Sequence, residues 1–206
     1  MDTSSCQVTI WITARLSLAN PLSSIVNLSA RRVRDSITAD RVTSALEASP
    51  LDPHRLTLEI TESAMIGDPE SAVSPLRSIA ALGMHIAIDD FGTGCSAMAQ
   101  VTGYLVQQIT IDRSYVRGFD IDHGVTAIVN ASVGLARSSG LLVVVEVVDT
   151  LAQGMALRAP GCDLAQGFLC SKPATMTDVD LLLYEVTRDA NMAATRCMVP
   201  DMERLQ

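Results

Sequence analysis

Short apolar segments and longer helical patterns alternate along most of the chain. The apolar segments are rich in Val, Ile and Leu on both faces, which is typical of strands buried in a parallel sheet. We expect strands at residues 24–28, 55–60, 85–89, 108–112, 141–146 and 164–169. Between them, apolar residues at helical spacing predict helices at residues 39–48, 69–82, 125–139, 150–158 and 177–186.

Capping signals mark the expected helix boundaries. Thr38 and Thr177 are predicted N-caps, and Asp68 is a predicted cap directly before a proline. Gly83 and Gly140 stand where helices should stop.

Regular alternation of strand and helix is typical of a doubly wound sheet or of a (β/α)₈ barrel. No glycine-rich phosphate loop follows an expected strand, which favours the barrel. A complete barrel needs eight strands, and the shortfall lies at the N-terminal end, where residues 6–18 predict a helix with no strand before it. We therefore predict an α/β fold, an incomplete TIM-like (β/α)₈ barrel that lacks its first strands. Residues 1–188 form this partial domain and residues 189–206 a C-terminal extension.

Composition narrows the class of protein. The 206 residues are 48% hydrophobic and carry a net charge of −8 without a basic cluster, which argues against disorder and against binding of a nucleic-acid duplex. A small anionic ligand held through metal ions stays compatible with this charge. The five cysteines form no metal-binding or CxxC spacing, and the most apolar stretch, residues 141–148, is too short to span a bilayer. With no signal peptide visible, we expect a cytoplasmic protein with no membrane segment.

Polar or acidic residues close most of the expected strands. They are Asn27, Glu59, Asp89, Asp90, Asp112 and Glu146. In an α/β barrel these strand ends meet on the face that holds active sites, and burying unpaired carboxylates costs several kcal/mol each unless cations compensate them. Because all the ligands are oxygens, the pattern favours Mg²⁺ or Mn²⁺.

Each of these positions also has a simpler interpretation. A single acid after a strand often caps the next helix or lies in a surface loop. Asp112 followed by Arg113 is also explained by a local ion pair, and Asp68 by its capping role alone. The repetition of the same chemistry at successive strand ends favours the metal site.

Several segments, taken together, resemble one family. They are Val-Asn-Leu-Ser at 26–29, Leu-Glu-Ile-Thr-Glu-Ser at 58–63, Ile-Asp-Asp-Phe-Gly-Thr-Gly at 88–94, Ile-Asp-Arg-Ser-Tyr-Val at 111–116, Gly-Cys-Asp at 161–163 and Gln-Gly-Phe at 166–168. In this order and spacing they resemble the EAL-domain cyclic-di-GMP phosphodiesterases, over roughly residues 6–183. The family has a (β/α)₈-like barrel and hydrolyses cyclic di-GMP to linear pGpG with two Mg²⁺ or Mn²⁺ ions.

The resemblance implies roles for the matching residues. Asn27, Glu59 and Asp89 correspond to ligands of one metal ion. Asp89 also bridges to the second ion, with Asp90 and Glu146 beside it. Glu146 further corresponds to the catalytic base that acts on the attacking water.

Other matching residues surround this set. Glu62 corresponds to a carboxylate that braces the loop after Asp89. Gln166 corresponds to a residue near substrate and water, and Pro173 to the proline that follows the last strand. Asp112 and Asp149 belong to the same surroundings of the site. The loop from Phe91 to Ala97 corresponds to the family's dimer contact, so the implied partners are cyclic di-GMP and a second copy of the chain.

The chain departs from the family at four points. It contains no Glu-Ala-Leu motif, so we expect it to start about two strands late and to bind metal weakly unless that ligand is supplied. Thr110 stands where the family has a lysine beside the attacking water, Val147 where it has glycine, and Cys95 where it has tyrosine. A threonine brings no positive charge, and a β-branched residue resists the backbone conformations that glycine allows. We therefore expect hydrolysis to be impaired or lost.

Three interpretations stay open at this point. The chain is a metal-dependent cyclic-di-GMP phosphodiesterase or a fragment of one, a non-catalytic module that binds cyclic di-GMP or a protein, or a non-functional remnant.

Overall fold

A computed structural model of the chain describes residues 8–9, 23–35, 37–49, 51–65, 69–92, 105–119, 121–169 and 172. The predicted helix at 177–186, its cap Thr177, the cap Asp68 and the extension at 189–206 lie outside these residues.

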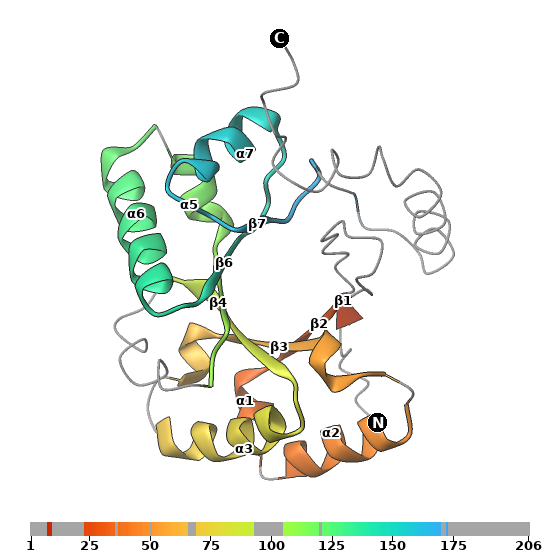
Figure 1. The fold of residues 1–206 in the computed structure, drawn as a ribbon. Coiled ribbons are helices and arrows are strands. Elements are labelled where there is room, and N and C mark those ends of the chain that lie inside the picture. Colours follow the sequence, from red (N-terminus) through yellow and green to blue (C-terminus); the bar gives the residue numbers. More distant parts are fainter. Residues whose placement is uncertain are drawn as a thin grey trace, which may run out of the picture.

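One sheet runs through the described part of the chain. Its strand order follows the sequence without interruption, and every neighbouring pair from β2 to β7 is parallel. A doubly wound sheet reverses its strand order at a switch point, so this order is that of a (β/α) barrel. Figure 1 shows the sheet curling around one side of the molecule. The strands are β1 (Val8–Thr9), β2 (Ser24–Leu28), β3 (Leu56–Thr61), β4 (His85–Phe91), β5 (Gln108–Ile111), β6 (Leu142–Val145) and β7 (Leu164–Ala165).

The helices lie along the outer side of the curled sheet (Figure 1). The predicted helices that fall within the described residues are all present, with ends that differ by at most two residues. Two short helices, α1 and α5, were not predicted. The α-helices are α1 (Ala30–Val33), α2 (Ile37–Glu47), α3 (Pro69–Ala81), α5 (Arg113–Gly118), α6 (His123–Ser138) and α7 (Leu151–Arg158), with 3₁₀ turns η1 (Pro53–Arg55) and η2 (Glu62–Met65).

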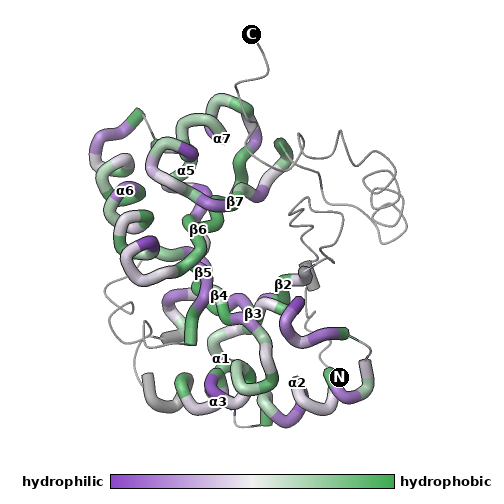
Figure 2. The backbone as a smooth tube through the Cα atoms, viewed as in Figure 1, coloured by the Kyte–Doolittle hydropathy of each residue, from purple (hydrophilic) through white to green (hydrophobic). Residues whose placement is uncertain are grey.

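The two faces of the sheet differ in chemistry. Side chains alternate between faces along a strand, and Leu58 and Ile60 of β3 join the hydrophobic core against the helices. Glu59, between them, therefore points to the inner face and is 4% exposed. Figure 2 shows hydrophobic and hydrophilic positions interspersed along the strands. The inner face is thus where polar chemistry can gather.

The helix boundaries correct one capping prediction. Helix α2 begins at Ile37, so Thr38 lies inside the helix, and its hydroxyl donates to the Arg32 carbonyl at 2.7 Å. Asp35 supports the start of α2 instead, because its carboxylate accepts a hydrogen bond from the amide of Ile37, the first residue of the helix, at 3.1 Å. The predicted stop at Gly83 is confirmed by its φ of +96°, two residues after α3 ends.

Gly140 likewise follows the end of α6, with a φ of +72°. Its amide donates to the Arg137 carbonyl at 3.0 Å. This predicted stop is also confirmed.

The predicted helix at residues 6–18 is wrong at Val8 and Thr9. These residues form β1 and pair antiparallel with Val26 and Ile25 of β2. Both are β-branched and favour strands, and the edge of β2 offers backbone groups that need partners. The other residues of that prediction lie outside the described part. None of the described helices is long and apolar enough to cross a membrane.

Candidate metal centre

Three carboxylates from three strands meet on the inner face of the sheet. Glu59 lies on β3, Asp89 on β4, and Glu146 directly after β6. One carboxylate oxygen from each lies within 4.8 Å of the others. We call this set the carboxylate cluster. Such spacing allows all three groups to bind one small cation.

Parallel register explains why these residues meet. Glu59 pairs with Ala87, two residues before Asp89 on the same face of β4. The Glu146 amide donates to the Ile111 carbonyl at the end of β5, which continues the sheet to the same edge. The carboxyl ends of the parallel strands therefore place the three acids together.

Each carboxylate of the cluster accepts a hydrogen bond from a neutral donor. The hydroxyl of Thr110 donates to Glu59 Oε1 at 3.0 Å, and the side-chain amide of Gln166 donates to Glu146 Oε1 at 3.2 Å. The Asp90 backbone amide donates to Asp89 Oδ1 at 2.8 Å. These contacts orient the acids without neutralising them.

Burial and mutual repulsion disfavour the charged forms of the cluster. Burial, and next the charge of Asp89, raise the pKa of Glu59 to about 7 and that of Glu146 to about 8. Burial and the charge of Asp90 raise the pKa of Asp89 to about 6. No lysine or arginine of the described part is among the groups that shift these three pKa values.

This donor set fits a hard divalent cation. Three oxygen ligands at one point are the chemistry that Mg²⁺, Mn²⁺ or Ca²⁺ binds. A bound cation would also favour the ionised forms that the buried site by itself resists.

Asn27 and Asp90, the other predicted ligands, lie beside the cluster. Asn27 is paired in register with Glu59 on the neighbouring strand, and its side chain hydrogen-bonds to Glu59 and lowers its pKa. Asp90 follows Asp89 with a φ of +56°, a left-handed conformation that is uncommon outside glycine. Burial and then the neighbouring Asp112 raise the pKa of Asp90.

Asp112 has a local structural role as well as this proximity. Its carboxylate caps α5 by accepting from the Ser114 amide at 2.9 Å. Partial burial acts to raise the pKa of Asp112, but the hydrogen bonds from Ser114, together with Arg113, bring it below its ordinary value.

The predicted surrounding residues lie around the same strand ends. Glu62 is buried, and its carboxylate accepts from the Gly92 amide at 3.2 Å, directly after β4. Asp149 accepts from the Phe168 amide at 3.3 Å, two residues after Gln166. Pro173 lies outside the described residues, as does the part of the predicted dimer loop after Gly92.

Val147 is held in a conformation that suits glycine. Its φ is +53°, and it directly follows Glu146. The fold therefore requires a left-handed residue at this position, and a β-branched side chain there is strained by about 1–3 kcal/mol.

One supporting residue has no role in the sequence prediction. The Tyr115 hydroxyl donates to the Gly92 carbonyl, so Gly92 is held by Glu62 through its amide and by Tyr115 through its carbonyl. Tyr115 lies in the motif at residues 111–116, and this position is the feature of the sequence that could have indicated its supporting role.

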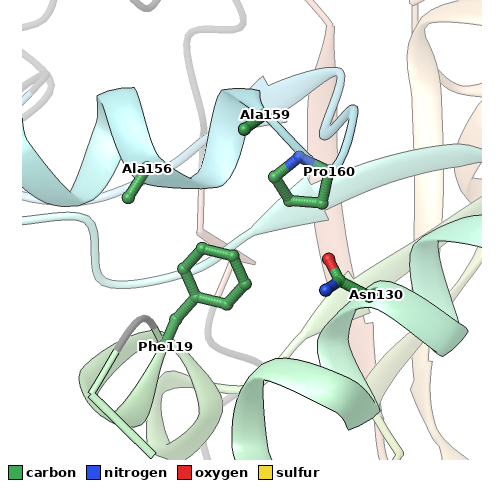
Figure 3. A pocket seen from close by; sticks show the side chains of 5 residues that line it. All are labelled: Phe119, Asn130, Ala156, Ala159 and Pro160. Carbon is green, nitrogen blue, oxygen red and sulfur yellow. The ribbon is translucent and has the colours of Figure 1, made fainter. Parts of the chain in front are cut away.

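A separate pocket of about 360 Å³ lies among the helices (Figure 3). It is lined by Phe119, Asn130, Ala156, Ala159 and Pro160. None of these side chains is acidic or belongs to the carboxylate cluster, so the pocket is not part of the candidate metal centre.

Comparison with known proteins identifies the family. The EAL domain model matches residues 7–173. The chain belongs to the EAL domain family. The fold prediction of an α/β, TIM-like EAL architecture is thereby confirmed.

Among curated relatives, the bifunctional diguanylate cyclase/cyclic di-GMP phosphodiesterase MucR of Pseudomonas aeruginosa is 38% identical over 148 residues, which cover 72% of this chain and 22% of MucR. The chain spans 19% to 22% of the length of several of the curated relatives that it matches.

Solved structures show the same similarity. The PaMucR phosphodiesterase in complex with c-di-GMP has a TM-score of 0.72 and 36% identity, covering 75% of this chain and 63% of that one. Klebsiella pneumoniae BlrP1 in a manganese/cy-diGMP complex has a TM-score of 0.66 and 31% identity, covering 73% of this chain and 38% of that one.

Proposed function

We propose that this EAL domain binds cyclic di-GMP at the carboxylate cluster through Mg²⁺ or Mn²⁺, and that its hydrolysis of the dinucleotide to pGpG is impaired or lost. The observation that carries the binding half is the convergence of Glu59, Asp89 and Glu146 within 4.8 Å. The similarity to EAL proteins solved with cyclic di-GMP supports the ligand.

The metal would be held by Asn27, Glu59, Asp89, Asp90 and Glu146. Bound there, it would supply positive charge to the ligand's phosphate oxygens and lower the pKa of a water molecule. Glu146 would act as the base, and two observations support this role: Gln166 donates a hydrogen bond to its carboxylate, and burial raises the pKa of that carboxylate. Glu62 and Tyr115 would fix the loop at Gly92 beside this site.

Two residues carry the proposal of weak hydrolysis. Thr110 places a neutral hydroxyl beside Glu59, where the family has a lysine. Val147 strains the backbone next to the proposed base. Loss of one preorganised electrostatic contact typically lowers kcat about 10²–10³-fold. Binding without efficient hydrolysis is the expected outcome.

We also propose that the domain forms a homodimer through the loop from Phe91 to Ala97. Phe91 and Gly92 are the described residues of this loop, and Gly92 is held by Glu62 through its amide and by Tyr115 through its carbonyl. Analytical ultracentrifugation should show a dimer, and a monomer at all accessible concentrations would contradict this part of the proposal.

Calorimetric titration tests the site. We expect Mn²⁺ to bind the purified chain, and cyclic di-GMP to bind more tightly in its presence. Asp89→Asn should abolish Mn²⁺ binding, because it removes the central carboxylate charge. Asp163→Asn is a matched control, since Asp163 accepts from the Val143 amide at the opposite end of β6. Equal Mn²⁺ binding by Asp89→Asn would show that the site is misassigned.

A further inference from the structure

The hydrogen bond between Thr110 and Glu59 joins two strands that are not neighbours. Thr110 lies on β5 and Glu59 on β3, with β4 between them. Adjacent strands are about 4.8 Å apart, so the two backbones are separated by about 10 Å. The contact is nevertheless 3.0 Å between the Thr110 hydroxyl and Glu59 Oε1.

Ala87 on β4 makes this reach possible. It is paired in register with Glu59 on one side and with Gln108 on the other. Its methyl group is the smallest side chain that could separate the two strands here, and it is fully buried. Because Ala87 carries only a methyl group, it leaves room on the inner face for the Glu59 side chain to cross β4 toward Thr110, two residues beyond Gln108 on β5.

The direction of the hydrogen bond follows from its chemistry. The Thr110 hydroxyl donates to Glu59 Oε1, and when Glu59 is ionised, as a bound cation would favour, its carboxylate can only accept. Thr110 is 1% exposed and Glu59 is 4% exposed, so bulk water does not compete for either group. Threonine is also stiff about χ1, which fixes the position of its hydroxyl on the strand.

We propose that Thr110 is a positioning residue for metal binding, which acts by holding one oxygen of Glu59 so that the carboxylate faces Asp89 and Glu146. The inference rests on the proposed function of the cluster as a metal site. Thr110 then has a role of its own in metal binding, in addition to standing where the family has a lysine. Hydrogen bonds that orient ligands typically change metal affinity about 10–100-fold when they are removed.

Manganese affinity, measured by calorimetry on the whole chain, tests this role. Thr110→Val removes the hydroxyl at nearly constant shape, and we expect it to weaken Mn²⁺ binding about 10–100-fold. Thr110→Ser keeps the donor and should bind within about threefold of the parent. The electron paramagnetic resonance spectrum of bound Mn²⁺ should change in Thr110→Val and be preserved in Thr110→Ser.

A matched control separates positioning from general effects on the sheet. Thr57→Val removes another buried hydroxyl from the inner face, two residues before Glu59 on β3. We expect its Mn²⁺ affinity to equal that of the parent. Urea unfolding of each variant verifies that it is folded.

The outcomes are distinguishable. Equal affinity of Thr110→Val and the parent would overturn the role of Thr110 and leave the metal site intact. Equal weakening by Thr57→Val and Thr110→Val would also overturn it, because the effect would then not depend on the contact with Glu59. A parent chain that binds no Mn²⁺ would instead overturn the proposed function, and this inference with it.

Discussion

Val147 shows at the level of one residue how the site and the backbone are connected. Its φ of +53° costs an L-residue about 1–2 kcal/mol relative to a right-handed conformation, whereas glycine avoids this cost. Val147→Gly and Val147→Ala both lose most contacts of the valine side chain. The difference in stability between these two variants therefore reports mainly on the backbone conformation. We expect the glycine variant to be more stable than the alanine variant by about 1 kcal/mol in urea unfolding.

The same exchange at an ordinary helical position is the control. At Ala127, within α6, a glycine should be less stable than the native alanine by about 1 kcal/mol. If glycine is also the less stable residue at position 147, the backbone strain there is not real.

The raised pKa values of the cluster predict how the metal-free chain responds to pH. Glu146 has a pKa of about 8 in the folded chain against an ordinary value of 4.5. Its contribution to stability is therefore fully present below about pH 4.5 and is lost as the pH rises toward 8, because the folded state must then hold the charge. In the presence of a chelator, we expect the unfolding temperature to fall between pH 5.5 and pH 8.5.

Glu146→Gln removes this ionisation and keeps the shape of the side chain. We expect a flatter pH dependence in that variant, and Mn²⁺ should flatten it in the parent. Parallel pH profiles for Glu146→Gln and the parent, measured by thermal unfolding in chelator, would contradict the assigned electrostatics.

The site residues could be predicted from sequence to the extent that each one ends an apolar run. Glu59, Asp89 and Glu146 could be predicted as site residues for this reason. Because the strands were predicted to be parallel, the three residues were also expected at the same edge of the sheet. The hydrogen bond from Thr110 to Glu59 could not be predicted, because it crosses an intervening strand and depends on the small size of Ala87. The need for a left-handed residue at Val147 was inferred from the family's glycine, and its φ agrees.

At the scale of elements, Gly167 lies in the segment after β7 that packs against the segment after Glu146. An added Cβ there would lie 2.3 Å from the Val148 carbonyl oxygen, because the two segments exchange backbone hydrogen bonds. We expect Gly167→Ala to lower the free energy of unfolding by about 2–3 kcal/mol. Since Gln166 orients Glu146, the variant should also bind Mn²⁺ more weakly.

Gly134→Ala is the control for that element. Nothing lies within 4 Å of an added Cβ in the middle of α6, so alanine should stabilise the helix by up to about 1 kcal/mol. Equal unfolding midpoints for the two variants in urea would show that the close packing at Gly167 is not important.

Helices with a long periodic pattern were predictable, and the short helices were not. Helices α2, α3, α6 and α7 have enough turns to show an apolar stripe. Helices α1 and α5 span four and six residues and are too short to show one. Strand β1 has only two residues and exists through its pairing with β2, which no local pattern reveals.

At the scale of the whole molecule, an uninterrupted parallel strand order carries the acids to one edge of the sheet. The family is established by the EAL domain match, and the barrel-like order agrees with it. Within that family, we propose that this domain binds cyclic di-GMP with metal and hydrolyses it slowly.

Chromatographic measurement of pGpG formation at saturating Mn²⁺ tests that claim most directly. It is made on the chain joined to the Glu-Ala-Leu segment of an active relative, with and without Thr110→Lys and Val147→Gly. We predict slow hydrolysis with Thr110 and Val147 in place, and a stepwise rise as each is changed, with about 10²–10³-fold expected from the lysine. Rapid pGpG formation with both native residues in place would contradict the account.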